Sequence, residues 1–180
     1  MQTIYLITTG GTIEKEYSEQ LGMVLNQESK IGQYLKCLRL PDAEVRIIPL
    51  MNKDSLEMTP EDRVTLATKV EQLVQLGFPI VITHGTDTMV ESGIAIERQL
   101  PDIAVPVILT GAMKPLGFDR SDGLQNITES LITVRLLGPG VYIVFHGQVL
   151  PATRAHKDRE RGTFVRTDSD AEFAEAQEPV

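Results

Sequence analysis

The chain has 180 residues, of which 42% are hydrophobic, and this composition supplies enough apolar side chains for the core of one domain. Its 25 acidic and 17 basic residues give a formal net charge of −8, so a nucleic acid would have to bind against the overall field, and nucleic-acid binding is not expected. The single cysteine, Cys37, excludes an internal disulfide and a multi-cysteine zinc site.

The N-terminal stretch MQTIYLITT contains no positively charged segment before its apolar run. That run is also far too short to span a bilayer. We therefore expect a cytoplasmic protein that does not associate with membranes.

Five short apolar runs alternate along the chain with segments of helical periodicity. The runs are rich in β-branched residues and nearly continuous in apolar residues, as expected for strands that are covered on both faces. They occupy residues 3–8, 43–50, 79–84, 105–110 and 140–146.

The clearest helix signal follows the second run. Thr59 is placed to cap the helix, Pro60 takes the first helical position, and Asp62 lies three residues after the cap. Gly77 is placed to end the helix. The apolar residues predicted to share its buried face are Val64, Ala67, Val70, Leu73 and Val74.

Three further helices are predicted, at residues 28–38, 88–100 and 121–137. Thr88 and Glu91 have the spacing of a capping box at the start of the second of these. Near the last helix, Lys114, Asp122 and Asn126 are expected to organise the turn and the helix start rather than to contact a substrate.

The alternation of strands and helices predicts an α/β fold with a doubly wound, mostly parallel sheet and helices on both faces. We expect a single domain over residues 1–168. Residues 169–180 are acidic and are expected to form a C-terminal tail.

In a sheet of this type, ligands bind beyond the carboxyl ends of the strands. The segments that follow the first four predicted strands are TGGT, MNKDSLEM, HGTDT and TGAMKP. Together they offer hydroxyl groups, carboxylates, and glycines that permit close approach of the backbone. We therefore expect a binding site at this edge of the sheet.

The common nucleotide-binding loops do not fit these segments, because neither G-x-G-x-x-G nor a glycine-rich loop ending in Lys-Ser/Thr is present. Gly10 and Gly11, considered alone, are equally compatible with a simple turn. His84, His146 and His156 lack the spacing of metal ligands, so no metal site is predicted. For His84 we favour a hydrogen-bonded residue beside the sheet over a catalytic one.

Hydroxyl chemistry remains. A threonine hydroxyl is a poor nucleophile at neutral pH and needs a base, an orienting group, and donors aimed at the developing oxyanion. The segment HGTDT places Thr86 beside Asp87, and Lys157 is the candidate lysine to serve them. Because lysine is ordinarily protonated at neutral pH, we interpret Lys157 as a member of a proton relay rather than as a free amine.

The segments TTGGTIEK, KDSLEMTPED, ITHGTDTMVES and LTGAMKP resemble, in order and in spacing, the signature segments of the bacterial-type L-asparaginases, the asparaginase/glutaminase amidohydrolases. The resemblance covers residues 1–168 and corresponds to the larger N-terminal domain of that family, so the sequence looks like a short form. It implies hydrolysis of the side-chain amide of L-asparagine to L-aspartate and ammonia through an acyl-enzyme on threonine, with no metal or organic cofactor.

The resemblance also implies catalytic roles. Thr12 matches the threonine that attacks the amide carbon, and Tyr17 matches the tyrosine of a lid over the substrate. Thr86, Asp87 and Lys157 match the family's second threonine, aspartate and lysine. Backbone amides near Thr12 and Thr86 are the expected oxyanion hole.

Substrate-binding roles follow in the same way. Ser55 matches the serine that holds the α-carboxylate of the substrate, and Asp87 would also pair with the α-ammonium group. Ala112 matches a main-chain contact near the scissile amide. Gly11 and Thr86 complete the predicted substrate-binding set.

Two departures from the family pattern leave alternatives open. Relatives usually carry a second, C-terminal domain that completes the site of a neighbouring subunit, and Leu56 stands where many relatives have a polar side chain. The resemblance implies a homo-oligomer, dimeric or larger. A glutaminase, another amidase that uses the same threonines, and a catalytically impaired amino-acid-binding protein remain alternatives.

Overall fold

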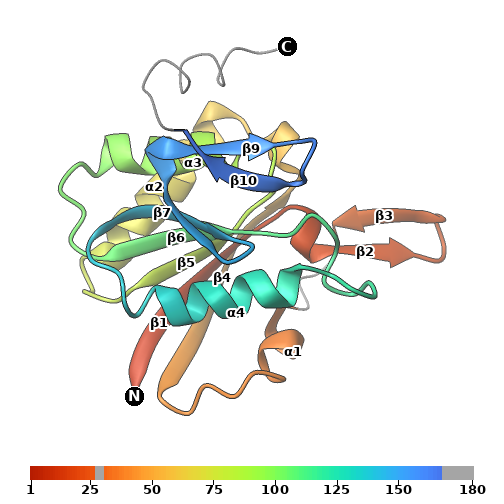
Figure 1. Cartoon of the computed structure of the whole chain (residues 1–180), viewed down its shortest axis with the longest axis horizontal. Helices are drawn as coiled ribbons and strands as arrows, with labels where there is room; N and C mark the ends of the chain where they lie inside the picture. Colours follow the sequence, from red (N-terminus) through yellow and green to blue (C-terminus); the bar gives the residue numbers. More distant parts are fainter. Residues whose placement is uncertain (27–30, 168–180) are drawn as a thin grey trace.

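A computed structural model of the chain describes residues 1–26 and 31–167. Its central sheet consists of β1 (Gln2–Gly10), β4 (Ala43–Lys53), β5 (Ile80–Thr83), β6 (Pro106–Thr110), β7 (Gly140–Phe145) and β8 (Gln148–Pro151). The strand order is β4-β1-β5-β6-β7-β8 (Figure 1). The first five strands in this order are parallel, and β8 pairs antiparallel with β7. The predicted single α/β domain with a mostly parallel sheet is confirmed.

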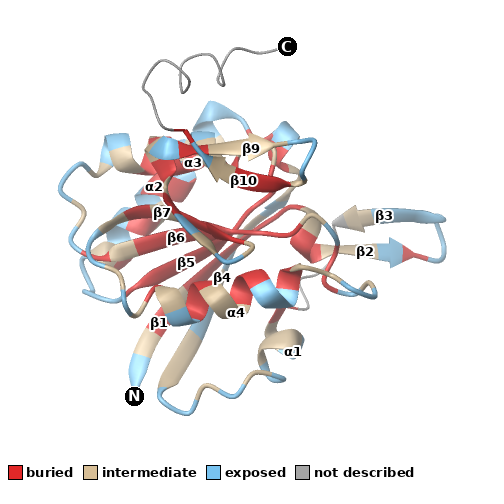
Figure 2. Ribbon diagram, in the orientation of Figure 1, coloured by how far each residue is buried: buried red, intermediate tan, exposed pale blue. Residues whose placement is uncertain are grey.

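Helices cover both faces of the sheet. They are α1 (Ile31–Leu35), α2 (Pro60–Val74), α3 (Met89–Gln99) and α4 (Gly123–Thr133). Ile80 and Ile82 of β5 pack in one buried cluster with α2 and α3, whereas the intervening Val81 packs in a second cluster with α4. Alternate residues of a central strand thus face opposite layers, and the centre of the sheet is buried on both sides (Figure 2).

Local signals set the start of α2 as predicted. The Thr59 hydroxyl accepts the backbone N–H of Asp62 at 3.3 Å, and the Asp62 carboxylate accepts the N–H of Thr59 at 2.9 Å. The capping box predicted for Thr88 and Glu91 is wrong. The Thr88 hydroxyl instead donates to the carbonyl of Ser55 at 2.8 Å, and Glu91 pairs with Arg63.

Two predictions of burial are also wrong. β4 is an edge strand, so its side chains are half-buried or exposed rather than covered on both faces. The buried residues of α2 are Leu66, Ala67, Val70 and Leu73. Val64, which was predicted to share the buried face, lies outside it and is 57% exposed. The centre of the buried face lies about 130° from Val64 around the helix axis, as expected from 3.6 residues per turn.

Two antiparallel hairpins were not predicted, because each of their strands has only four residues, which is too short to show a clear apolar period. β2 (Lys15–Ser18) pairs with β3 (Met23–Asn26), and this hairpin projects from the body of the domain (Figure 1). β9 (Ala155–Asp158) pairs with β10 (Thr163–Arg166). Phe164 of β10 is fully buried with the apolar residues of α2 and α3, so this second hairpin belongs to the core.

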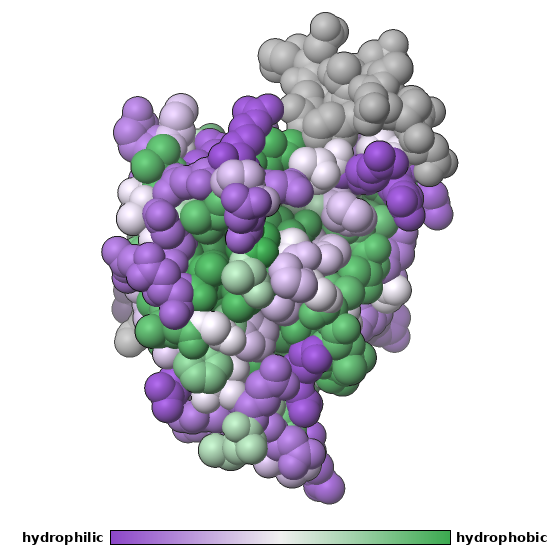
Figure 3. All heavy atoms as spheres, turned by 90° about the vertical axis from the view of Figure 1, so that its left-hand side faces the viewer, coloured by the Kyte–Doolittle hydropathy of each residue, from purple (hydrophilic) through white to green (hydrophobic). Residues whose placement is uncertain are grey.

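The side of the molecule away from the β2–β3 hairpin carries hydrophobic patches between hydrophilic side chains (Figure 3). None of the helices in residues 1–26 and 31–167 is long and apolar enough to cross a membrane. The predicted tail at 169–180 and residues 28–30 of the first predicted helix lie outside the described residues.

Replacement of Phe164 tests how strongly the β9–β10 hairpin is held. The ring packs edge-on against Phe145 with centroids 5.1 Å apart. We expect Phe164→Ala to lower the free energy of unfolding by about 3–5 kcal/mol, through lost burial and the cavity left behind. Val149→Ala, at a position 41% exposed, is the control and should change it by about 1 kcal/mol or less. Urea denaturation followed by circular dichroism measures both, and equal losses would contradict the packing described.

Candidate active site

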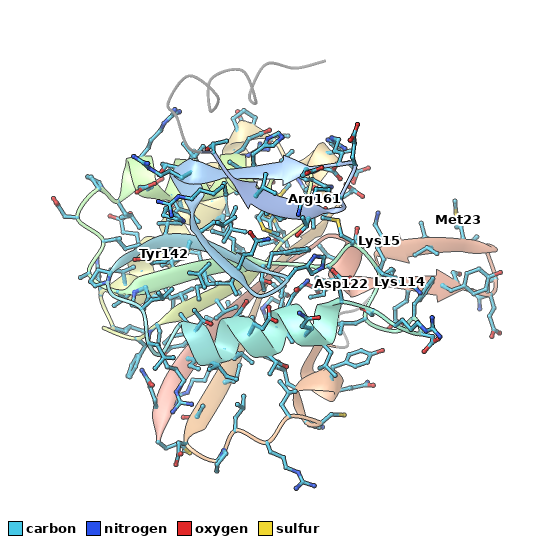
Figure 4. All side chains as sticks on the ribbon, in the orientation of Figure 1. Lys15, Met23, Lys114, Asp122, Tyr142 and Arg161 are labelled. Atoms are coloured by element: carbon cyan, nitrogen blue, oxygen red, sulfur yellow. The ribbon has the colours of Figure 1, made fainter. Side chains whose placement is uncertain are left out.

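Polar segments converge at the carboxyl ends of the parallel strands. Lys15, Lys114, Asp122 and Arg161 lie toward one end of the sheet, and Tyr142, in the first half of β7, lies toward the other (Figure 4). The loops after β1, β4, β5 and β6 all open at the first of these ends. The loops from which the sequence predicts a site therefore lie at one edge of the sheet.

Glycine backbones bring the first and third loops into contact. Gly10 and Gly11 have φ angles of 93° and 79°, which favour glycine. A Cβ atom on Gly11 would overlap the backbone of Gly85, and one on Gly10 would overlap that of Lys53. We expected these glycines to let the backbone approach a ligand closely. In the structure they instead let the backbones of neighbouring loops pack against each other.

The short 3₁₀ helix η1 (Thr12–Glu14) follows these glycines. Thr12 is half-buried at its start, next to Gly11 and hence beside the loop that contains Gly85 and Thr86. Tyr17 lies on β2 opposite Val24 and is 56% exposed. No interaction within the described residues joins Tyr17 to Thr86, so the structure brings Thr12 to the site but leaves Tyr17 out on the projecting hairpin.

Lys157 contacts the segment HGTDT from about 70 residues further along the chain. Its Nζ donates to Thr86 Oγ1 at 2.7 Å and to Asp87 Oδ1 at 3.0 Å. Lys157 lies on β9, and its partner residue across the hairpin is the buried Phe164 of β10. The structure thus brings Thr86, Asp87 and Lys157 together, as the sequence predicted, through a hairpin that the sequence did not predict.

Arg159 is a second cation on the same carboxylate, and sequence reasoning missed it. Its Nη1 lies 2.9 Å from Asp87 Oδ1, the oxygen that also accepts Lys157. Arg159 lies in the turn that directly follows β9. No strand or helix period in the sequence marks it, because its contact with Asp87 depends on the turn between β9 and β10.

Ser55 contributes a hydroxyl with no partner. The residue is 1% exposed at the start of η2 (Ser55–Glu57), packed against Gly85, and its Oγ makes no hydrogen bond within the described part of the chain. A buried hydroxyl without a partner is costly, so this atom is a candidate to bind a ligand group. Its carbonyl accepts Thr88 Oγ1, which fixes the loop.

Asp54 and Lys15 connect this loop to the base of the β2–β3 hairpin. Lys15 Nζ lies 2.6 Å from Asp54 Oδ2, and the Asp54 carboxylate also accepts the N–H of Leu56. The hydrogen bond from Lys15 is the main reason that the pKa of Asp54 is lowered, although partial burial opposes it. Leu56 is 71% exposed, and its side chain offers no polar group.

The loop after β6 contains Ala112, which is fully buried. Asp122 accepts the N–H groups of Met113 and Lys114 at 2.9 and 3.0 Å, and Asn126 donates to the carbonyl of Gly111 at 3.0 Å. Burial tends to raise the pKa of Asp122, but the backbone hydrogen bond from Met113 and the bond from His146 outweigh it, and the pKa is lowered. As predicted, Asp122 and Asn126 organise this turn.

Glu14 is a buried residue that sequence reasoning also missed. It is 5% exposed and accepts the Thr83 hydroxyl at 2.8 Å and the N–H of Gly10 at 3.3 Å. Thr9 donates its hydroxyl to the Thr83 carbonyl at 2.8 Å. These bonds link the first threonine loop to the end of β5, which leads into the second.

His84 is hydrogen-bonded on both ring nitrogens. Nδ1 lies 2.7 Å from the carbonyl oxygen of Gly85 and must carry the proton, because a carbonyl can only accept, and Nε2 accepts from the Ser92 hydroxyl at 2.8 Å. Burial lowers the pKa of His84 to about 4. The ring is therefore neutral at pH 7 and structural, in agreement with the favoured interpretation.

No cluster of three or more His, Cys, Asp or Glu side chains suited to a metal ion occurs in residues 1–26 and 31–167. That the protein uses no metal or organic cofactor stays a prediction.

The family model for the N-terminal domain of asparaginase matches residues 3–168 of the chain. An L-asparaginase of Thermococcus kodakarensis is 31% identical over 88% of this chain, and L-asparaginase 1 of Escherichia coli is 35% identical over 72% of it. A subunit of the glutamyl-tRNA(Gln) amidotransferase of Methanococcus vannielii is 29% identical over 83% of it. The chain spans 48%, 39% and 35% of the length of these three relatives.

The solved structure of the thermostable L-asparaginase from Thermococcus kodakarensis superposes with a TM-score of 0.83 at 30% sequence identity. The match covers 93% of this chain and 52% of that one. The fold described above is therefore shared with about half of a longer chain.

The burial of His84 predicts a dependence of stability on pH. Its folded pKa of about 4 lies below the usual value of about 6.5, so between these pH values the unfolded chain binds a proton that the folded chain does not. The contribution of His84 is thus fully present above about pH 6.5, and about 3 kcal/mol is lost as the pH falls to about 4.

The measurement compares the unfolding free energies of wild type and His84→Gln from pH 7 to pH 4 by urea denaturation. Glutamine does not titrate, and the carboxylates contribute equally to both proteins. The difference between the two proteins should shrink as the pH falls. A constant difference would show that His84 is not protected from protonation in the folded state.

Proposed function

The chain belongs to the asparaginase family, and on this premise we propose that it is an amidohydrolase that cleaves the side-chain amide of L-asparagine to L-aspartate and ammonia. The observation that carries the proposal is Lys157 Nζ, 2.7 Å from Thr86 Oγ1 and 3.0 Å from Asp87 Oδ1, beside the loop that contains Thr12. Two threonines, a lysine and an aspartate on adjoining loops are a suitable set for attack on a carbonyl and for transfer of its protons.

In the first step of the proposed reaction, Thr12 Oγ1 attacks the amide carbon and gives up its proton. The amide nitrogen gains a proton and leaves as ammonia, which leaves an ester of Thr12. Thr86, held by Lys157, is the group that we assign to move the proton, and backbone amides near Thr12 and Thr86 stabilise the oxyanion. In the second step, water attacks the ester, releases L-aspartate and restores the Thr12 hydroxyl.

Binding of the amino acid is assigned to the surrounding loops. The unpartnered hydroxyl of Ser55 is suited to donate to the α-carboxylate of the substrate. Asp87 is suited to pair with the α-ammonium group, and the main chain at Gly11 and Ala112 lines the position of the amide. Tyr17, on the β2–β3 hairpin, would reach the substrate only when that hairpin moves toward the site.

A second candidate is an amidase that uses the same threonines on another amide, such as that of glutamine. The similarity to a protein named as part of an amidotransferase favours this alternative. A catalytically impaired amino-acid-binding protein is a third candidate. Ammonia released from L-asparagine and from L-glutamine, measured in parallel, separates the first two, and binding without any release would identify the third.

A homo-oligomer of two or more copies and a cytoplasmic location remain part of the proposal. So does the division into a domain at residues 1–168 and a tail at 169–180. The oligomer follows from the family expectation that a neighbouring subunit contributes to each site, and light scattering on the purified chain measures it.

Removal of either threonine hydroxyl tests the mechanism. We expect Thr12→Val and Thr86→Val each to lower kcat for ammonia release from L-asparagine by about a thousandfold or more, because each removes a reacting group. Thr65→Val is the matched control, since Thr65 is exposed on α2 and should leave kcat within about twofold. Full activity in Thr12→Val would exclude the acyl-enzyme assigned to Thr12.

Removal of the Ser55 hydroxyl tests substrate binding separately from chemistry. A hydrogen bond to a charged group is worth about 1.5–3 kcal/mol, so Ser55→Ala should raise KM for L-asparagine by about tenfold or more. The value of kcat should change much less, because this bond is present in both ground and transition states. An unchanged KM would remove Ser55 from the proposed site.

A further inference from the structure

Two positively charged side chains contact the same carboxylate oxygen of Asp87. Its Oδ1 lies 3.0 Å from Lys157 Nζ and 2.9 Å from Arg159 Nη1. Lys157 is 15% exposed and is also bonded to Thr86, whereas Arg159 is 71% exposed and forms no other ion pair within the described residues. The carboxylate is thus compensated once by a fixed cation and a second time by a loosely held one.

This arrangement matters for the substrate, because Asp87 is the residue proposed to receive an α-ammonium group. An ammonium would be the third cation on one carboxylate, and Lys157 and Arg159 both oppose it. When an amide without that group binds, the negative charge of Asp87 is already balanced by Lys157 and Arg159. Asp87 therefore keeps a counter-charge when such an amide is bound. The second of the two cations is then left to attract the carboxylate of the substrate.

We propose that Arg159 is a specificity-determining residue that allows the site to accept carboxylate-bearing primary amides without an α-ammonium group, such as succinamate. The inference rests on the proposed function, because it concerns the substrate of the same site. An exposed ion pair is weak, so Arg159 is displaceable and L-asparagine still binds. Arg159 therefore shifts the preference between the two classes of amide rather than excluding one.

The chain supplies a matched control in the same turn. Arg161 is also 71% exposed, but it pairs with Asp158, and its backbone N–H donates to that carboxylate at 2.9 Å. Arg161→Gln removes the same charge at a nearby position without touching Asp87. Arg159→Lys keeps a cation near Asp87 and serves as the conservative variant.

The test measures the dissociation constants of L-aspartate and succinate, which differ only in the α-ammonium group, by calorimetry on the full chain. In Arg159→Gln we expect the ratio of the succinate constant to the aspartate constant to rise about fivefold, which corresponds to about 1 kcal/mol. Arg161→Gln and Arg159→Lys should stay within about twofold of wild type. Circular dichroism verifies that every variant is folded.

An unchanged ratio in Arg159→Gln, or an equal shift in Arg161→Gln, would overturn the inference, and so would a wild type that binds neither ligand. Release of ammonia from L-asparagine and succinamate is measured alongside, and the ratio of kcat/KM should shift in the same direction. If the wild type released ammonia from neither amide while Arg159→Gln still shifted the binding ratio, the proposed function would be contradicted and the role of Arg159 would be supported. An active enzyme with an unchanged ratio would contradict the role of Arg159 alone.

Discussion

Contact between the backbones of Gly11 and Gly85 holds the two threonine loops together. No side chain fits between them, so Thr12 and Thr86, each the next residue, are carried on adjacent loops at the ends of β1 and β5. The Thr83 side chain reinforces the contact, because its hydroxyl is bonded to Glu14 of the first loop. A larger residue at Gly11 would overlap the Gly85 backbone and push the two threonine loops apart, whereas one at Gly85 would overlap Ser55.

The β9–β10 hairpin adds what the parallel sheet alone does not supply. A sheet edge offers loops in the order of its strands, and Lys157 comes from outside that order. The hairpin is fixed by the buried Phe164 and by His146, whose ring bridges Thr163 of β10 at 3.1 Å and Asp122 at 2.9 Å. The lysine and the loop that contains Ala112 are therefore positioned by one connected set of contacts.

Local signals were enough to predict the parts of the fold that depend on them. The apolar runs predicted the parallel sheet, and Thr59 caps α2 because its partners lie within three residues. Contacts between distant segments were not predictable in this way. Thr88 satisfies the carbonyl of Ser55 instead of capping α3, and Arg159 reaches Asp87 only because a hairpin whose strands are too short to show a clear apolar period folds back over α3.

The charged stretch that follows TGGT shows how such contacts give meaning to residues that sequence alone leaves unexplained. Glu14 turns inward and joins the first loop to the end of β5, whereas Lys15, the next residue, pairs with Asp54 in the loop of Ser55. A glutamate and a lysine in succession thus hold two different loops against the Thr12 segment. The two side chains do not pair with each other, because each has another partner: Glu14 accepts from Thr83 at the end of β5, and Lys15 pairs with Asp54 just after β4. The base of the hairpin that carries Tyr17 is consequently fixed, even though Tyr17 itself is exposed.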